Sequence, residues 1–189
     1  MRLTLPPPGV EAVLLTLVLG AAVYDVRYRR IPNWLTVGGV LTGLALNTFM
    51  GRIDLSPGWP ALRFSLLGLG IGFGVYLALY AVRAMGAGDV KLMAAIGTML
   101  GWEDWFGVFL ITAVIGGAMA LILVLIKRRL AKTFFNVGVI LNEFKSGRPA
   151  YLAREELDVK NPKSLGLPHG AVIAVGTLFF LGVAAHYTK

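Results

Sequence analysis

The chain has 189 residues, of which 57% are hydrophobic and 15% charged, with a formal net charge of +8 and a mean hydropathy of +0.73. Soluble domains carry about 45–50% apolar and about 25% charged residues, and a short chain cannot hide such an apolar excess in one water-soluble core. The composition therefore excludes an ordinary soluble domain, and the lack of cysteine excludes disulfides, a cysteine zinc site and a thiol nucleophile.

Six apolar runs approach or exceed the length needed to cross about 30 Å of hydrocarbon. They are residues 10–24, 34–50, 62–82, 90–100, 105–126 and 168–186. The run at 90–100 is short for a straight span, so we expect it to be tilted or completed by the loop before it. We predict an all-α, polytopic membrane protein with about six transmembrane helices, forming one membrane-embedded domain over residues 1–189.

The first run could be taken for a secretory signal peptide, with Ala21 and Ala22 near a cleavage point. Three prolines interrupt the segment before it, however, and the basic cluster of Arg27, Arg29 and Arg30 follows the run instead of preceding it. We therefore predict that this run is a retained membrane anchor.

One long polar stretch, residues 127–167, separates the fifth run from the sixth. Within it, residues 133–144 place apolar side chains at helical spacing, which predicts an amphipathic helix in the membrane interface. Trp59, Trp102 and Trp105 stand at the ends of apolar runs, where aromatic side chains anchor at the level of the headgroups.

Basic residues cluster beside the apolar runs, as in cytoplasmic membrane loops, and if Arg27 lies inside, most of the 18 lysines and arginines lie inside with it. This distribution predicts that both chain termini face outward. It also predicts contact between the inner basic residues and anionic lipid headgroups. Because membrane topology accounts for the positive charge, we expect no nucleic-acid partner.

Most acidic residues fall in loops and are expected to be solvated. These are Asp54, Glu103, Asp104, Glu143, Glu155, Glu156 and Asp158. Asp25 and Asp89 differ, because each borders an apolar run, where an ionisable group usually faces a protein-lined or watery cavity. The chain crosses the membrane twice between them, so both return to the same inner face and can meet.

Two carboxyl groups that share a site hold one proton between them. This state suits peptide hydrolysis, because the ionised group takes a proton from water while the protonated group donates to the carbonyl oxygen. On spacing alone, helix capping or pairing with Arg27 or Lys91 explains Asp25 and Asp89 equally well.

Two motifs surround these aspartates: DVRYRRIPN at residues 25–33 and GAGDVK at residues 86–91. In this order, and each at a membrane boundary, they resemble the two signature motifs of the type IV prepilin peptidases, which are Gly-x-Gly-Asp membrane aspartic proteases. The Leu-Pro-His-Gly segment at residues 167–170 extends the resemblance over most of the chain.

The resemblance implies an endopeptidase that cuts the basic leader from pilin-like precursors at the cytoplasmic face of a bacterial inner membrane. It implies that Asp25 and Asp89 form the catalytic dyad, with no metal and no cofactor. The other motif residues are then assigned to substrate binding: Gly86, Gly88, Lys91, Arg27, Pro32 and Asn33.

A physical role can be proposed for each of these residues. Gly86 and Gly88 would allow unusual backbone angles and close approach of the substrate chain. Pro32 would bias the residue before it towards an extended conformation. Arg27 and Lys91 would hold negative lipid headgroups or favour the ionised dyad.

Larger members of this family resemble a fusion in which a cytosolic segment with paired Cys-x-x-Cys motifs, associated with N-methylation, precedes the protease. This chain has no cysteine and only 24 residues before Asp25, so it resembles the minimal core found in tight-adherence (Flp) pilus systems. That branch implies cleavage after the last leader residue, usually glycine, and pilus assembly machinery as a partner; we expect no methylation.

His169 and His186 stand at opposite ends of one helix, cannot share a metal, and are expected to be structural.

Other classes remain compatible with the sequence. One is a small transporter whose aspartates bind a cation or relay protons, although the internal repeats typical of transporters are not evident. Another is a non-catalytic component of a pilus or secretion machine, which would tolerate loss of either aspartate. A third is a preflagellin-type leader peptidase with a different substrate.

Overall fold

The computed structural model describes residues 5–51, 55–128, 130–146 and 167–187, which form helices and connecting turns without a β-strand. The helices are α1 (Pro8–Tyr28), α2 (Asn33–Met50), α3 (Trp59–Ala81), α4 (Ala87–Ile126), α5 (Leu130–Lys145) and α7 (His169–Tyr187). Four of them, α1, α3, α4 and α7, are long and apolar enough to cross a membrane. The prediction of an all-α membrane protein is confirmed to this extent.

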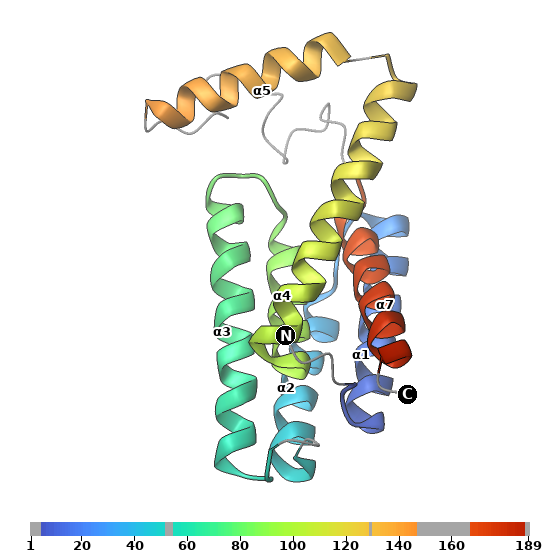
Figure 1. Cartoon of the computed structure of the whole chain (residues 1–189), viewed down its shortest axis with the longest axis vertical. Coiled ribbons are helices and arrows are strands. Elements are labelled where there is room, and N and C mark those ends of the chain that lie inside the picture. Colours follow the sequence, from blue (N-terminus) through green and yellow to red (C-terminus); the bar gives the residue numbers. More distant parts are fainter. Residues whose placement is uncertain (1–4, 52–54, 129, 147–166, 188–189) are drawn as a thin grey trace.

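Helix α4 contains both the fourth and the fifth predicted spans and reverses direction at Gly101. Gly101 has φ 77° and ψ 176°, a conformation that favours glycine. Trp105 Nε1 donates a hydrogen bond of 3.1 Å to the carbonyl of Met93, whereas twelve residues of straight helix would set these positions about 18 Å apart. Figure 1 shows the two halves of α4 lying side by side. Six separate spans are therefore not confirmed, because the run at 90–100 turns back inside the bundle.

The first half of α4 is the centre of the molecule. Its apolar side chains Leu92, Met93, Ile96, Met99 and Leu100 are fully buried, and α4 packs against α1, α2, α3 and α7. The beginning of α4, which carries Asp89, is therefore held in place by the surrounding helices.

Glycine lets the backbones of α3 and α4 touch. A Cβ added to Gly68 would overlap the carbonyl of Gly97, and one added to Gly97 would overlap the carbonyl of Gly68. A Cβ on Gly72, one turn along α3, would lie 2.7 Å from the carbonyl of Met93. Small residues at the crossing of membrane helices permit this close packing.

Gly68→Ala should destabilise the protein by about 1–3 kcal/mol, because the added methyl group can be placed only by moving α3 away from α4. Gly70→Ala is the matched control on the same helix, since no atom lies within 4 Å of its added Cβ. Unfolding of the two variants in detergent micelles would be compared with the wild type. Equal losses in both variants would contradict the close contact between α3 and α4.

Two residues expected at the surface are buried instead. Trp105 is 1% exposed and its ring stacks on Phe109 with centroids 5.5 Å apart, whereas Trp59 and Trp102 are 66% and 46% exposed. Asp104 is 3% exposed and lies in the first helical turn after Gly101, where a carboxylate is favoured by the helix dipole. The reversal at Gly101 is the cause, because it folds this segment into the bundle.

Helix α5 occupies the place of the expected amphipathic helix and lies across one end of the bundle (Figure 1). Phe134 and Phe135 are 74% and 60% exposed. Apolar side chains presented in this way fit a helix that rests on a membrane surface, and that location remains a prediction. Residues 147–166 of the polar stretch lie outside the described part of the chain.

Candidate active site

The C-terminal end of α1 and the N-terminal ends of α2, α4 and α7 lie at the same end of the bundle (Figure 1). Asp25 is in the last turn of α1, and Asp89 is the third residue of α4. Asn33 begins α2, and Gly170 is the second residue of α7. Helices α2 and α3 run to the far end of the bundle and back, and so return the chain from Asp25 to Asp89.

Asp25 is held by α7. It is 9% exposed, and its Oδ2 accepts a hydrogen bond of 2.7 Å from the backbone N–H of Gly170. The first N–H groups of a helix have no partner within that helix, so Asp25 caps α7 from the neighbouring α1. A Cβ on Gly170 would lie 3.1 Å from Asp25 Oδ2 and 2.9 Å from Cδ1 of Ile31, which explains why a glycine stands there.

Asp89 is held by its own helix. It is 8% exposed, and its Oδ2 accepts a hydrogen bond of 3.0 Å from the backbone N–H of Gly86, the residue that precedes α4. This bond satisfies an otherwise unpaired donor at the helix start. Each carboxylate is therefore oriented by one backbone N–H through Oδ2.

Further contacts join the two motifs. Lys91 Nζ donates a hydrogen bond of 2.8 Å to Oδ1 of Asn33. Ile31 lies against Gly88, where an added Cβ would be 3.2 Å from the Cβ of Ile31. The same isoleucine side chain borders Gly170. The segment after α1 is thus packed between the starts of α4 and α7.

The charge of Asp25 acts on Asp89, so the fold brings the two carboxyl groups within electrostatic range of each other. Among the described residues, neither Oδ1 atom has a hydrogen bond. The described residues include no group of three or more side chains suited to holding a metal ion.

The unusual backbone angles predicted for Gly86 and Gly88 are wrong, whereas the close approach of the substrate chain stays a prediction. Gly86 has φ −82° and ψ 154°, which any residue adopts, and Gly88 is an ordinary helical residue. What both positions require is space, since a Cβ on Gly86 would lie 3.2 Å from Asp89 Oδ2 and one on Gly88 would press on Ile31.

The remaining motif residues lie around the two aspartates. Pro32 directly precedes α2 with φ −64° and ψ 139°. Asn33 and Lys91 bind each other. The exposed guanidinium of Arg27 lies 5.8 Å from the ring centre of Tyr28. Their role in substrate binding remains a prediction.

The sequence analysis missed Gly170 as a site residue. Its backbone N–H is bound by Asp25, and its position in the Leu-Pro-His-Gly segment was the available signal. Next to it, His169 packs on the buried Tyr76 of α3, with ring centres 6.5 Å apart. No local pattern marks Tyr76, because its place depends on how α3 packs.

The bond between Asn33 and Lys91 should couple the two motifs energetically. We expect Asn33→Ala and Lys91→Ala to be non-additive in unfolding free energy by about 0.5 kcal/mol, since the contact is exposed to solvent. Arg63, exposed on α3 at the far end of the bundle, provides the control: Asn33→Ala and Arg63→Ala should be additive. Additivity in both pairs would show that the bond does not join the motifs.

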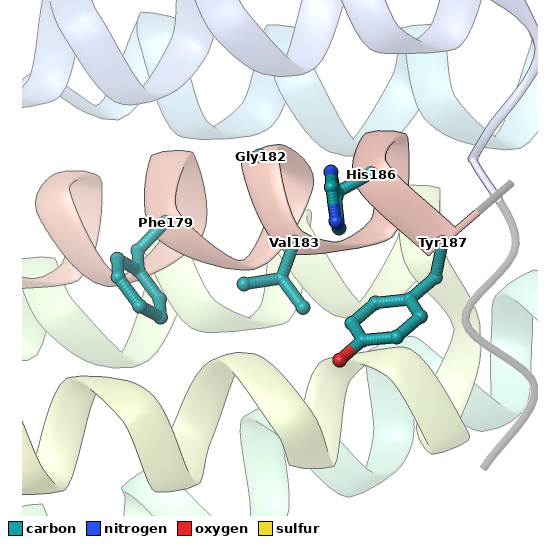
Figure 2. A pocket seen from close by; sticks show the side chains of 5 residues that line it. All are labelled: Phe179, Gly182, Val183, His186 and Tyr187. Carbon is teal, nitrogen blue, oxygen red and sulfur yellow. The ribbon is translucent and has the colours of Figure 1, made fainter. Parts of the chain in front are cut away.

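A shallow apolar groove of about 310 Å³ lies elsewhere, near the C-terminal end of α7. It is lined by Phe179, Gly182, Val183, His186 and Tyr187. Figure 2 shows that all of these lining residues belong to this one helix. Since α7 begins at the aspartates and ends at the groove, the groove is not part of the site.

Comparison with known proteins gives consistent matches. The model of the Type IV leader peptidase family matches residues 12–121, which include both aspartates. A prepilin leader peptidase/N-methyltransferase of Escherichia coli (strain K12) is 33% identical over 119 residues, 61% of this chain and 52% of that protein. Proteins of the same name from Aeromonas hydrophila and Myxococcus xanthus (strain DK1622) are 32% identical over 119 residues and 30% over 120.

The Aeromonas match covers 62% of this chain and 41% of its relative, and the Myxococcus match covers 60% and 34%. The alignments therefore span about half, or less, of the length of these relatives. No solved structure is a significant match to the chain.

Proposed function

Because this chain belongs to the Type IV leader peptidase family, we propose that it is a membrane aspartic endopeptidase that removes the short basic leader of a pilin-like precursor. The observation that carries this proposal is that Asp25 and Asp89 each accept a backbone N–H at helix ends that Ile31 joins by packing on both Gly88 and Gly170. The relatives bear the name prepilin leader peptidase, which supports the class of substrate.

In the proposed reaction, one carboxylate takes a proton from a water molecule while the water oxygen attacks the scissile carbonyl carbon. The other carboxyl group donates its proton to the carbonyl oxygen, which gives a neutral tetrahedral diol. One diol hydroxyl then returns its proton to a carboxylate, and the acid protonates the leaving nitrogen as the C–N bond breaks. The products are a leader with a new carboxyl group and a pilin with a new amino terminus.

The position of the site fits a substrate that lies partly in the bilayer. Helices α1, α3, α4 and α7 are candidate membrane spans, and the aspartates stand where α1 ends and α4 and α7 begin. The described basic residues Arg27, Arg83 and Lys91 flank the same end of the bundle, which the positive-inside rule assigns to the cytoplasm. The basic leader of the precursor would remain at that face while its apolar helix occupies the membrane.

The finer assignments are part of the proposal. The chain acts as a single peptidase domain, residues 1–189, in the bacterial inner membrane with both termini outside and its inner basic residues on anionic lipid headgroups. Its substrates are precursors of the tight-adherence (Flp) type, and its products are passed to the pilus assembly machinery.

A cleavage assay in membranes tests the proposal. The wild-type protein would be co-expressed with an Flp-type precursor and, separately, with a type IV pilin precursor, and the products would be analysed by mass spectrometry. We expect a cut after the last leader residue, with the Flp-type precursor cut faster. If the protein accumulates but cuts neither precursor, a transporter or a non-catalytic assembly component becomes the better account.

A further inference from the structure

Ile31, three residues after the end of α1, borders the starts of both α4 and α7. A Cβ added to Gly88, the residue before Asp89, would lie 3.5 Å from Cδ1 of Ile31. A Cβ added to Gly170, whose N–H binds Asp25, would lie 2.9 Å from the same methyl group. One methyl group of Ile31 therefore touches the neighbours of both aspartates.

The backbone on both sides of Ile31 holds this side chain in place. The N–H of Arg29, which has φ 53°, donates a hydrogen bond of 2.9 Å to the carbonyl of Asp25 and ends α1 with a turn. Pro32 directly precedes α2 and biases Ile31 towards an extended conformation. Ile31 is partly buried against the apolar core, and its branched Cβ makes it stiff about χ1. It thus has the properties of a rigid spacer.

Resting on the proposed function, we propose that Ile31 is a positioning residue whose Cδ1 methyl group sets the spacing between Asp25 and Asp89. Asp89 follows the start of α4, because it lies in the first turn of that helix and binds the N–H of Gly86. Asp25 follows the start of α7, because it binds the N–H of Gly170. Without the methyl group the two helix starts can approach each other, and the carboxyl groups leave the positions in which they act on one peptide bond.

Two substitutions at Ile31 separate spacing from packing. Ile31→Val removes Cδ1 alone, whereas Ile31→Leu keeps a δ-methyl group and moves the branch point from Cβ to Cγ. Both changes are mild in an apolar core, so both variants should fold. Misplacement of a reacting group by about 1 Å costs up to about 100-fold in rate. We expect Ile31→Val to lower kcat by about 10-fold with KM unchanged, and Ile31→Leu to retain more of kcat.

Ile96→Val is the matched control, because it removes the same methyl group from a fully buried isoleucine two helical turns after Asp89 on α4. It should cleave a basic-leader pilin precursor like the wild type, at a similar protein level in the membrane. Equal kcat in Ile31→Val and Ile96→Val would mean that Ile31 only fills space. That result would overturn the inference and leave the peptidase function intact.

Cross-linking reports the spacing without cleavage. Asp25→Cys/Asp89→Cys carries the only two thiols of the chain, and its cross-linking yield would be measured with thiol reagents of increasing length, with and without Ile31→Val. We expect Ile31→Val to shift the highest yield to a shorter reagent. An unchanged profile would overturn the spacer, whether or not the wild type cleaves. A shifted profile in a protein whose wild type cuts no precursor would support the spacer and overturn only the peptidase function.

Discussion

Asp25→Asn and Asp89→Asn are each expected to reduce precursor cleavage by about 10²–10⁴-fold, the range typical of removing a general acid or base. Asparagine keeps the size and polarity of aspartate but cannot exchange a proton at the pH of the cell. A dyad needs one group to accept a proton and the other to donate it, so the loss of either should have a similar effect.

Both variants should still fold. The structural task of each carboxylate is to accept one backbone N–H, from Gly170 at Asp25 and from Gly86 at Asp89, and the amide oxygen of asparagine can accept the same bond. Protein levels in the membrane and unfolding in detergent would be measured beside cleavage. Loss of cleavage in a variant that has also lost its fold would say nothing about the role of the carboxylate, so the protein level and the unfolding of each variant must be measured.

Asp104→Asn is the matched control for these two variants. Asp104 is also a buried aspartate of α4. It follows the reversal at Gly101, however, whereas Asp89 stands at the start of the helix, so the two lie at opposite ends of the first half of α4. We expect this variant to keep cleaving. Full activity in Asp25→Asn or Asp89→Asn would exclude that residue from the dyad and leave helix capping as its only role.

Gly170→Ala is expected to have the second-largest effect, lowering kcat by about 100-fold through displacement of Asp25. The added Cβ would press on Oδ2 of Asp25 and on Ile31, at 3.1 Å and 2.9 Å. Either the start of α7 or the carboxylate must shift. The hydrogen bond of 2.7 Å from the Gly170 N–H to Asp25 would then lengthen.

Gly182→Ala provides the comparison on the same helix, because no atom lies within 4 Å of its added Cβ. Both substitutions make the same chemical change within α7, and a larger loss at Gly170 is expected from the lack of space there. Cleavage rates would be measured at saturating precursor. Equal rates in the two alanine variants would mean that Gly170 does not hold Asp25 in its working position.

The sequence predicted the apolar runs and the pair of aspartates for physical reasons that act locally. Hydropathy reports how long a segment can remain in lipid, and Asp25 and Asp89 stand out because charge is costly beside such a segment. The crossing of the chain between them predicted that they return to one face, and Ile31, shortly after Asp25, does pack against Gly88, the residue before Asp89.

The features that sequence could not supply depend on three-dimensional packing. A hydropathy pattern gives the length of apolar segments but not where the chain turns back, so the reversal at Gly101 and the burial of Trp105 and Asp104 were missed. Nor does local spacing reveal that the N–H of Gly170 reaches Asp25, a bond between residues 145 positions apart. The glycines of the second motif were assigned to backbone freedom, whereas their neighbours show that they provide room.

Cross-linking would test most directly whether Asp25 and Asp89 form one site. The chain has no cysteine, so Asp25→Cys/Asp89→Cys would carry the only two thiols, and a short bifunctional thiol reagent would be applied in membranes. Asp25→Cys/Trp59→Cys is the control, because Trp59 begins α3 at the far end of the bundle. We predict an intramolecular cross-link, identified by mass spectrometry, in the first pair alone. Reaction of all four thiols with no link between positions 25 and 89 would contradict a shared site, and with it the aspartic mechanism.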